Sequence, residues 1–247
     1  MAEAVVSGKR SVLEALRAGE AAEILIAKGA KESPGMRDVL DAARGAEVPV
    51  RTAERSALDA LADDHRGVVA RLGSHPAPTL GERDLSAFAW TPDAVAVVLD
   101  GVEDPQNLGA AARSVEASGG QMLITRTHRS APVTDAAIRA SAGALLHLPH
   151  ARVANLARAV ARLHDAGFTV IGLDGSATGS IYDAPCPDGR VALVVGNEGA
   201  GLSRLVRERC DLLVSLPMHG KVGSLNAAAS LAAVLYAYVL PRGGDEG

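Results

Sequence analysis

The stretch AVAVVLDGVEDPQNLGAAARSVEASGGQMLIT, residues 94–125, decides the fold class of this chain. It opens with an unbroken apolar run, which is typical of a strand buried on both faces. After Asp104-Pro105, apolar residues recur at positions 108, 111, 112 and 115, the spacing of one helical face. Gly119-Gly120 ends this helix and QMLIT forms the next strand. A strand, a helix and a second strand in this order predict a parallel sheet.

The same alternation continues toward the C-terminus. Strands are expected in TVIGLD, VALVVG and LLVSLP, and helices in VANLARAVARLHDAG and SRLVRERC. Residues 94–247 are therefore predicted to form an α/β domain with a mostly parallel sheet covered on both faces. Near the end, the almost wholly apolar residues 224–240 are rich in Ala and stand alone. This composition favours a buried or interface helix over a membrane anchor.

The first part of the chain is predicted to be a separate, smaller domain. Residues 1–72 alternate between short helical and strand patterns, which indicates a small α/β domain. Residues 73–93 are rich in Pro, Gly and Ser and have no sustained period, so we expect a linker there.

Composition narrows the class of protein. Of 247 residues, 48% are hydrophobic and 22% are charged, which is ordinary for a folded soluble protein. The net charge of −4 argues mildly against a nucleic-acid partner, although a local basic patch is compatible with it. Cys186 and Cys210 fit no zinc or disulfide pattern, so no metal is expected. The first residues lack a secretory apolar stretch, which predicts a cytoplasmic location.

Three loops at predicted strand ends combine glycines with polar side chains. They are residues 100–109, 196–203 and 217–226. Ligands of open parallel sheets bind at the carboxyl ends of the strands, and glycine lets backbone approach a ligand closely. Each loop taken alone also has a simpler explanation. Asn107 and Ser224 could be helix caps, and Glu198 could be a solvated carboxylate.

Several common catalytic motifs are missing from the sequence. The second loop has the spacing G-x-x-G-x-G, which differs from the dinucleotide fingerprint G-x-G-x-x-G. No P-loop, G-x-S-x-G or H-E-x-x-H occurs. The commonest nucleotide-binding and hydrolase functions are therefore disfavoured.

Together, the three loops resemble motifs one to three of the SpoU, or TrmH, RNA methyltransferases. The segments that match these motifs are N-L-G-A-A-A-R at 107–113, G-N-E-G-A-G-L-S at 196–203 and L-P-M-x-G-x-V-x-S-L-N at 216–226. Their order and separations also match. V-S-G-K-R-S-V-L-E-A-L at 6–16 and H-R-G-V-V-A-R-L at 65–72 are similar to the RNA-binding domain of the RlmB group, which methylates guanosine in 23S ribosomal RNA. The resemblance covers almost the whole chain.

This resemblance implies a fold, a donor and partners. It implies a SPOUT-type α/β domain with a C-terminal trefoil knot, which holds S-adenosylmethionine without a metal. It also implies a homodimer and an RNA substrate, with 23S ribosomal RNA as the first candidate. The residues implied to hold the donor are Thr125, Gly196, Asn197, Gly201, Leu216, Met218, Ser224 and Leu225.

The residues implied to act on the ribose are Asn107, Arg113, Glu198, Ser224 and Asn226. The ribose 2′-hydroxyl must lose its proton as it is methylated, and a guanidinium is a poor base because it stays protonated. Two roles for Arg113 stay open. It acts as the base if the site favours the neutral guanidine, or it clamps an RNA phosphate while phosphate or water accepts the proton. Physical chemistry favours the clamp.

Some positions depart from the family pattern or are left undecided. Ala228 stands where close relatives have a hydroxyl, and His219 and Lys221 replace small residues. These two side chains either touch RNA phosphate or are solvated. Basic residues of the first domain that could contact RNA, although each is individually more typical of an ordinary surface, are Lys9, Arg10, Lys28, Lys31, Arg37 and Arg66.

Other functions remain to be weighed against ribose methylation of 23S ribosomal RNA. The same chemistry could act on transfer RNA or on another ribosomal nucleotide, including one that confers antibiotic resistance. A non-catalytic RNA-binding protein of this fold is disfavoured by the intact set Asn107, Arg113, Glu198 and Asn226. A dinucleotide-binding enzyme is disfavoured by the missing fingerprint.

Overall fold

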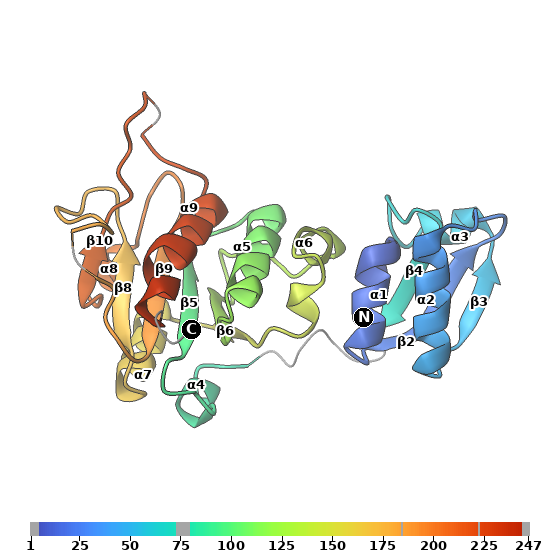
Figure 1. Ribbon diagram of the computed structural model, residues 1–247, viewed down its shortest axis with the longest axis horizontal. Helices are drawn as coiled ribbons and strands as arrows, with labels where there is room; N and C mark the ends of the chain where they lie inside the picture. The colour runs from blue at the N-terminus through green and yellow to red at the C-terminus, as the bar shows by residue number, and fades with distance from the viewer. Residues whose placement is uncertain (1–4, 73–79, 184, 222, 244–247) are drawn as a thin grey trace.

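The computed structural model describes residues 5–72, 80–183, 185–221 and 223–243. It has two domains that lie side by side along the long axis of the molecule, each built on its own sheet (Figure 1). The predicted division into two α/β units thus corresponds to two separate sheets. Part of the predicted linker, residues 73–79, lies outside the described residues.

The N-terminal domain is a four-stranded mixed sheet in the order β1-β4-β2-β3. β2 and β3 are parallel, whereas β4 runs antiparallel to both of its neighbours. Only β1 was not expected from the sequence, because three residues are too few to show a period. The elements are β1 (Val5–Ser7), α1 (Lys9–Arg17), β2 (Ala21–Ala27), α2 (Pro34–Gly45), β3 (Val50–Ala53), α3 (Arg55–Asp59) and β4 (Val68–Leu72).

The C-terminal domain is a six-stranded sheet in the order β10-β8-β9-β5-β6-β7, and every pair is parallel. The predicted parallel sheet is confirmed. The strands are β5 (Val95–Asp100), β6 (Met122–Arg126), β7 (His150–Val153), β8 (Thr169–Leu173), β9 (Val191–Gly196) and β10 (Leu212–Val214). The helices are α4 (Asp84–Ala87), α5 (Pro105–Ala117), α6 (Asp135–Ala140), α7 (Leu156–Asp165), α8 (Arg204–Arg207) and α9 (Ala227–Val234).

Central strand β5 shows why both faces of the sheet are covered. All six of its residues are buried. Val95, Val97 and Leu99 belong to the apolar cluster that includes α5 and α9. Ala96 and Val98 belong to the opposite cluster, with α7. Because side chains alternate along a strand, a strand with apolar residues at every position requires a helix layer on each side.

A short helix occurs inside the predicted linker. Helix α4 buries Leu85 completely, and Trp90 is 8% exposed. The Trp90 indole donates to the Leu85 carbonyl at 3.0 Å and packs edge-on against Phe168. Residues 80–93 therefore pack on the C-terminal domain instead of serving only as a connection. Four helical residues are too few to show a period in the sequence.

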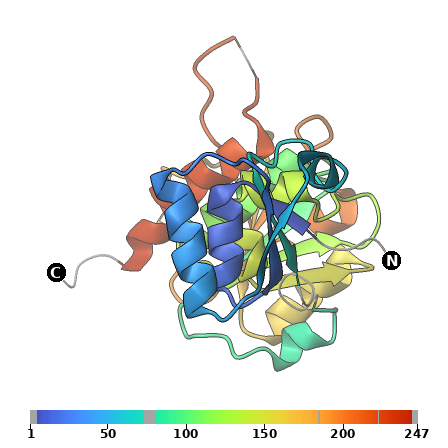
Figure 2. The same ribbon diagram turned by 90° about the vertical axis from the view of Figure 1, so that its right-hand side faces the viewer.

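The apolar C-terminal segment forms the helix α9, a π-helical turn over Leu235–Val239 and a final 3₁₀ turn over Leu240–Gly243. Leu231, Val234 and Leu235 are fully buried, as expected for a core helix. Among the described residues, no helix combines the length and the hydropathy needed to cross a membrane. The segment between β10 and α9 forms a loop that projects beyond the rest of the domain (Figures 1 and 2).

The two domains meet where β1 and α1 face α6. Buried Ser7 donates its N–H to Asp135 at 3.1 Å, and Arg139 donates to the Ser7 hydroxyl at 2.7 Å. Further into the C-terminal domain, α6 packs on α5 through Gly109, where an added Cβ would collide with the Ala137 carbonyl. The domain contact and the helix α5 are thus joined through α6.

Candidate active site

The three polar loops meet at one edge of the C-terminal sheet, beyond the carboxyl ends of β5, β9 and β10. Asn107, in the first turn of α5, donates from Nδ2 to Glu198 Oε1 at 2.9 Å. Asn226 donates from Nδ2 to Asn107 Oδ1 at 2.8 Å. Glu198 Oε1 also accepts from the backbone N–H of Ala227 at 3.2 Å. The predicted convergence of these side chains is therefore present as a continuous hydrogen-bonded chain.

The direction of this chain follows from its two ends. Asn226 Oδ1 accepts from the N–H groups of Ala228 and Ala229, so its Nδ2 must face Asn107. At the other end, the ionised Glu198 side chain can only accept. Each amide has one orientation that satisfies both neighbours, so the three side chains are fixed relative to one another.

The simpler explanations for these residues can now be decided. The cap of α5 is Asp104, whose side chain accepts from Gln106, so Asn107 is not a cap. Asn226 caps α9, and Ser224 does not. Glu198 is exposed, yet it holds two loops together. Asn226 thus serves as both a helix cap and a member of the site.

The loop after β9 folds back on itself. The N–H of Gly201 donates to the Asn197 carbonyl at 2.8 Å, and Asn197 Nδ2 donates to the Gly101 carbonyl at 2.9 Å. A Cβ on Gly196 would collide with the carbonyl group of Gly201. Glycine is therefore required at 196, because the backbone passes too close for any side chain.

A pocket of about 320 Å³ opens beside this loop. Seven of the eight residues predicted to hold the donor line it, namely Gly196, Asn197, Gly201, Leu216, Met218, Ser224 and Leu225. The eighth, Thr125, does not line it. That side chain is fully buried and is hydrogen-bonded to His150 at 2.8 Å. The structure places it away from the site.

Sequence analysis missed one wall of the pocket, which is formed by Leu173, Asp174 and Gly175 at the carboxyl end of β8. The signal was the same as for the other loops, a polar residue and a glycine after a buried strand. Asp174 accepts from Arg207 and from both donors of Ser176. Burial alone would raise the pKa of Asp174, but these hydrogen bonds outweigh it and the pKa lies below its ordinary value. The carboxylate stays ionised at neutral pH.

The charge of the pocket is one-sided. Asp174 and Glu198 are the charged side chains among the lining residues that the structure describes. The rim includes the partly exposed apolar side chains of Met218 and Leu225. A pocket of this kind favours a ligand that combines an apolar or aromatic part with a positive charge.

A second, smaller hollow of about 230 Å³ lies next to the first and shares Asn197, Glu198 and Ala227 with it. Glu103 and Asp104 line its other side. Asn197, Glu198 and Ala227 therefore separate the two spaces, and Asn107, which lines the smaller one, holds Glu198 in place.

Arg113 is not brought to either space. It lies on α5 six residues after Asn107, about 9 Å further along the helix axis. The side chain is exposed, lines neither pocket and has no hydrogen-bond or ion-pair partner among the described residues. The predicted catalytic set is therefore assembled within one chain except for this residue.

Comparison with known proteins identifies the chain. The model of the SpoU rRNA methylase family matches residues 94–236. The chain belongs to the SpoU methylase family. A second model, described as the substrate-binding domain of RNA 2′-O-ribose methyltransferases, matches residues 5–77. As a SpoU methylase, the protein is an RNA 2′-O-ribose methyltransferase that uses S-adenosylmethionine.

Individual relatives of this SpoU methylase agree. An uncharacterised tRNA/rRNA methyltransferase of Mycolicibacterium vanbaalenii is 40% identical over 94% of this chain and 74% of its own length. A putative TrmH family tRNA/rRNA methyltransferase of Staphylococcus epidermidis is 34% identical over 96% and 95%. The crystal structure of the SpoU methyltransferase AviRb from Streptomyces viridochromogenes, in complex with AdoMet, is 30% identical, covers 99% of this chain and 92% of that chain, and has a TM-score of 0.81.

The larger pocket fits the donor that the SpoU family uses. S-adenosylmethionine carries a sulfonium charge, which the carboxylates of Asp174 and Glu198 complement. The volume of the pocket lies at the lower end of the range for small-molecule sites. The close approach of Gly196 and Gly201 leaves backbone groups at the pocket surface, where they can bind an adenosine edge.

Proposed function

We propose that this enzyme methylates the 2′-hydroxyl of a guanosine in 23S ribosomal RNA, with the donor in the larger pocket and the target nucleotide in the adjacent hollow. The observation that carries this proposal is the position of Glu198, which lines both spaces and is held in place by the hydrogen-bonded chain Asn226–Asn107–Glu198. A fixed wall between two ligands holds the reacting groups in one relative position. Such positioning is the main contribution that a protein makes when a bound cofactor supplies the reactive group.

On the donor side, S-adenosylmethionine supplies a methyl group that its sulfonium activates toward nucleophiles. Residues 196–201, Leu216, Met218 and residues 223–225 would bind it through backbone groups, and Asp174 would attract its positive charge. We also propose that the segment after β10 passes through a loop to form the trefoil knot of the family. In support, loops after three different strands, β8, β9 and β10, line this one pocket.

On the ribose side, Asn107 has both ends of its amide engaged within the protein. Its role is to position Glu198 and Asn226, while Ser224 is exposed at the pocket and available to the ribose. Arg113 clamps the phosphate next to the target ribose, which stabilises the negative charge that develops as the 2′-hydroxyl loses its proton to that phosphate or to water.

Guanosine is favoured by the carboxylates of the smaller hollow. The Watson–Crick edge of guanine presents N–H donors at N1 and N2, and one carboxylate can accept from both. Glu103 is exposed and has no hydrogen-bond partner among the described residues, whereas Asp104 is engaged as the α5 cap. We therefore assign guanine recognition to Glu103.

We propose that the enzyme works as a homodimer in which Arg113 of one protomer serves the site of its partner. Arg113 is exposed and lines neither space of its own chain. Helix α5 packs beside α9, and the turn that follows α9 exposes Tyr236 and Leu240, 52% and 40% accessible. An exposed apolar surface of this kind is what a second copy would cover. Its ribosomal RNA substrate would place this dimer in the cytoplasm.

The experiment that tests the proposal is methylation of purified bacterial ribosomal RNA and transfer RNA with radiolabelled donor, followed by mapping of the modified ribose. The expected result is label at one guanosine of 23S ribosomal RNA. Label on transfer RNA alone would contradict the substrate assignment, and absence of label on either RNA would contradict the activity. The Glu103→Gln variant should incorporate less label at guanosine than the wild-type enzyme, while its affinity for the donor stays unchanged.

Subunit mixing tests the dimer. Arg113→Ala is expected to be almost inactive, and Asn226→Ala is expected to keep about a tenth of the wild-type turnover. When the two are mixed and allowed to exchange subunits, dimers with one intact site form, and about a quarter of the activity per site should return. If no activity returns although sedimentation shows exchange, Arg113 does not act in the partner's site.

A further inference from the structure

A pocket of about 410 Å³ lies between the two domains, and none of its described lining residues lines the donor pocket or the smaller hollow. Among the residues that the structure describes, its lining has four basic side chains, Lys9, Arg10, Arg66 and Arg139, and one carboxylate, Asp64. The first three belong to the N-terminal domain and Arg139 belongs to α6. The pocket therefore exists only while the domains are docked, and it has the opposite charge to the donor pocket.

Unused backbone donors line this pocket at the start of α1. Gly8 precedes the helix and provides no side-chain cap. The N–H groups of Lys9, Arg10 and Ser11 have no hydrogen-bond partner among the described residues, and the first amide to be paired is that of Val12. These amides and the positive end of the helix dipole attract an anion.

The Ser11 hydroxyl is a second, independent indication of a ligand. The residue is only 5% exposed and lines the pocket. Its hydroxyl has no partner among the described residues, whereas Ser114 in α5 and Ser141 after α6 each donate to a carbonyl one turn back. The Ser11 oxygen is absent from the fully buried side-chain atoms that lack a partner, so it is accessible from the pocket and available to a ligand there.

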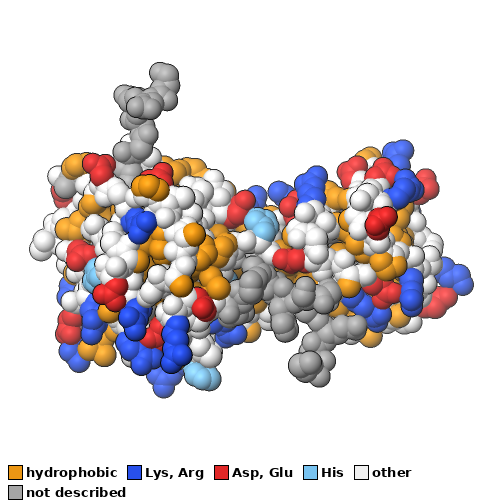
Figure 3. Space-filling view, turned by 90° about the horizontal axis from the view of Figure 1, so that it is seen from below, with side chains coloured by type: hydrophobic (Ala, Val, Ile, Leu, Met, Phe, Trp, Pro, Cys, Tyr) orange, Lys and Arg blue, Asp and Glu red, His pale blue; other side chains and the backbone are white. Residues whose placement is uncertain are grey.

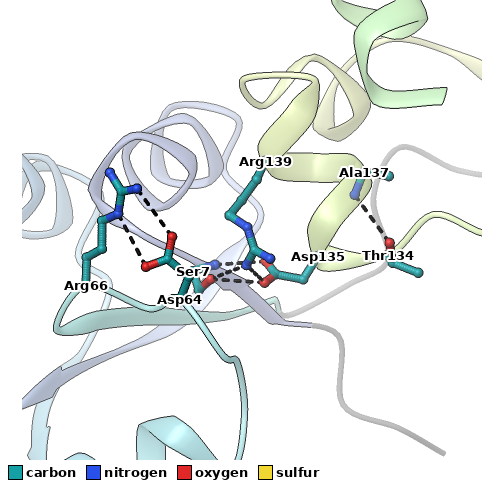
Figure 4. A network of polar contacts seen from close by, with 7 residues as sticks. All are labelled: Ser7, Asp64, Arg66, Thr134, Asp135, Ala137 and Arg139. Atoms are coloured by element: carbon teal, nitrogen blue, oxygen red, sulfur yellow. Dashed lines mark hydrogen bonds and ion pairs between the residues drawn. The ribbon is translucent and has the colours of Figure 1, made fainter. Parts of the chain in front are cut away.

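The two arginines on either side of Ser7 are held in place (Figure 4). Arg139 is fixed by Asp135 and the Ser7 hydroxyl. Arg66 lies in a turn with φ of 47°, and it is paired with Asp64 at 3.3 Å. His65 braces this turn, because Nδ1 accepts from Gly67 while Nε2 donates to Asp59.

Arg10 adds a cation to the site that is not engaged by a carboxylate of the described residues. It is exposed and has no ion-pair or hydrogen-bond partner among the described residues. Elsewhere on the N-terminal domain, basic and acidic side chains are interspersed over the face drawn in Figure 3. A chain of net charge −4 thus concentrates unused donors at one place instead of spreading them over a basic surface.

We propose that this interdomain pocket binds a backbone phosphate of the RNA substrate, through the first-turn amides of α1, the Ser11 hydroxyl and Arg10. The inference rests on the proposed function for the identity of the anion. A phosphodiester fits because its two free oxygens can accept from several N–H and O–H donors at once. Arg66 and Arg139 supply charge from the two domains, so the bound phosphate spans the domain contact.

The test compares three variants of the full-length enzyme, Arg10→Gln, Ser11→Ala and the matched control Arg37→Gln. Arg37 is also an exposed arginine of the N-terminal domain, but it lies outside the pocket. Binding of purified ribosomal RNA is measured at several salt concentrations. Binding of inorganic phosphate is followed by phosphorus NMR. Alanine is well tolerated in a helix, so Ser11→Ala is expected to fold.

The expected result is about tenfold weaker RNA binding for Arg10→Gln and for Ser11→Ala, the loss of one hydrogen bond to a charged group. Arg10→Gln should also lower the salt slope by about 0.7–0.9, the value for one phosphate contact. Arg37→Gln should change RNA affinity less than twofold. If Arg10→Gln and Ser11→Ala bind RNA as tightly as the control Arg37→Gln does, the proposal is overturned. If the variants lose inorganic phosphate but keep RNA, the site binds a free anion and the RNA assignment is overturned.

Failure of the proposed function can be recognised separately. If the wild-type enzyme binds RNA but methylates none, the activity is at fault, and the three variants still decide the pocket. If the wild-type enzyme methylates RNA, and Arg10→Gln and Ser11→Ala have the same KM for RNA as the wild type, only the proposal for the interdomain pocket fails. If the wild-type enzyme binds no RNA, both proposals fail.

Discussion

The donor pocket and the interdomain pocket of this SpoU methylase have opposite designs. In the first, carboxylates face the cavity and the polar side chains around it satisfy one another through Asn226, Asn107 and Glu198. In the second, arginines face the cavity, while amides and the Ser11 hydroxyl are left without partners. Donors that are hydrogen-bonded within the protein hold their side chains in one geometry, whereas donors without a partner are available to bind an acceptor on a ligand.

This difference explains how an acidic chain can act on RNA. The net charge of −4 counts every charged side chain of the protein, whereas the described lining of the interdomain pocket has four basic residues and the carboxylate of Asp64. Affinity for a polyanion depends on where the cations lie and much less on the total.

The largest effect is expected from Arg113→Ala, because the site then lacks the cation that stabilises the developing charge. Turnover should fall on the order of 100- to 1000-fold. Donor affinity, measured by calorimetry, should stay within twofold, since Arg113 lines no part of the donor pocket. Arg162, an exposed arginine on α7, supplies the matched control Arg162→Ala. Normal turnover in Arg113→Ala would remove this residue from the mechanism.

Salt should separate the two pockets. Raising the salt concentration from 50 to 200 mM should weaken RNA binding roughly 100-fold if about four phosphates are contacted. The donor pocket binds a ligand of small net charge, so its affinity should change less than twofold over the same range. Equal salt dependence of the two affinities would contradict the contrast drawn here.

Gly196→Ala should damage the donor pocket alone. Its Cβ would collide with the Gly201 carbonyl, so the loop must move, and donor affinity should fall at least about tenfold. The matched control is Gly175→Ala, because Gly175 lines the same pocket but has open space around it. RNA binding by both variants should match the wild type. Equal donor affinity in the two variants would refute the steric argument.

Asn226→Ala tests the connected side chains against a simple cap. It should lose about 1 kcal/mol of stability as a helix cap and about tenfold in turnover, because Asn107 loses a partner. Asn155 caps α7 in the same way, through a bond to Arg158 of 3.1 Å. Asn155→Ala should lose similar stability in denaturant unfolding, but no activity. Similar turnover in the two variants would show that Asn226 is only a cap.

The smallest effect concerns pH and contrasts the two domains. Burial lowers the pKa of His150 to about 4, with a further contribution from Arg152. Its folded pKa is below the unfolded value of 6.5, so the unfolded C-terminal domain binds more protons and stability is lost as pH falls. Burial raises the pKa of Glu20 to about 7, so the N-terminal domain gains stability as pH falls.

Between pH 7.5 and 5.5, the His150 effect amounts to about 1 kcal/mol. Unfolding of each domain can be followed by hydrogen exchange of its own amides. His150→Gln should remove the pH dependence of the C-terminal domain, whereas the exposed control His147→Gln should keep it. A shift of both domains in the same direction would contradict the assignment.

The sequence predicted the parallel sheet and the three loops because strands buried on both faces are long apolar runs with glycines at their ends. The same runs concealed which way each side chain points. Thr125 ends one of them, and without alternation its direction toward His150 was not readable. Short elements such as β1 and α4 are below any period, and Asp174 was overlooked although its loop follows the same rule.

Gly109 fixes the position of helix α5 relative to helix α6. It lets α5 and α6 touch backbone to backbone, so the helix that carries Asn107 and Arg113 cannot slide against the helix that carries Arg139. An RNA that fills both the interdomain pocket and the active site must therefore present a phosphate and a ribose at one set separation. If both proposed sites are used at once, the enzyme would methylate only those RNAs whose folded shape sets this separation between the phosphate and the ribose.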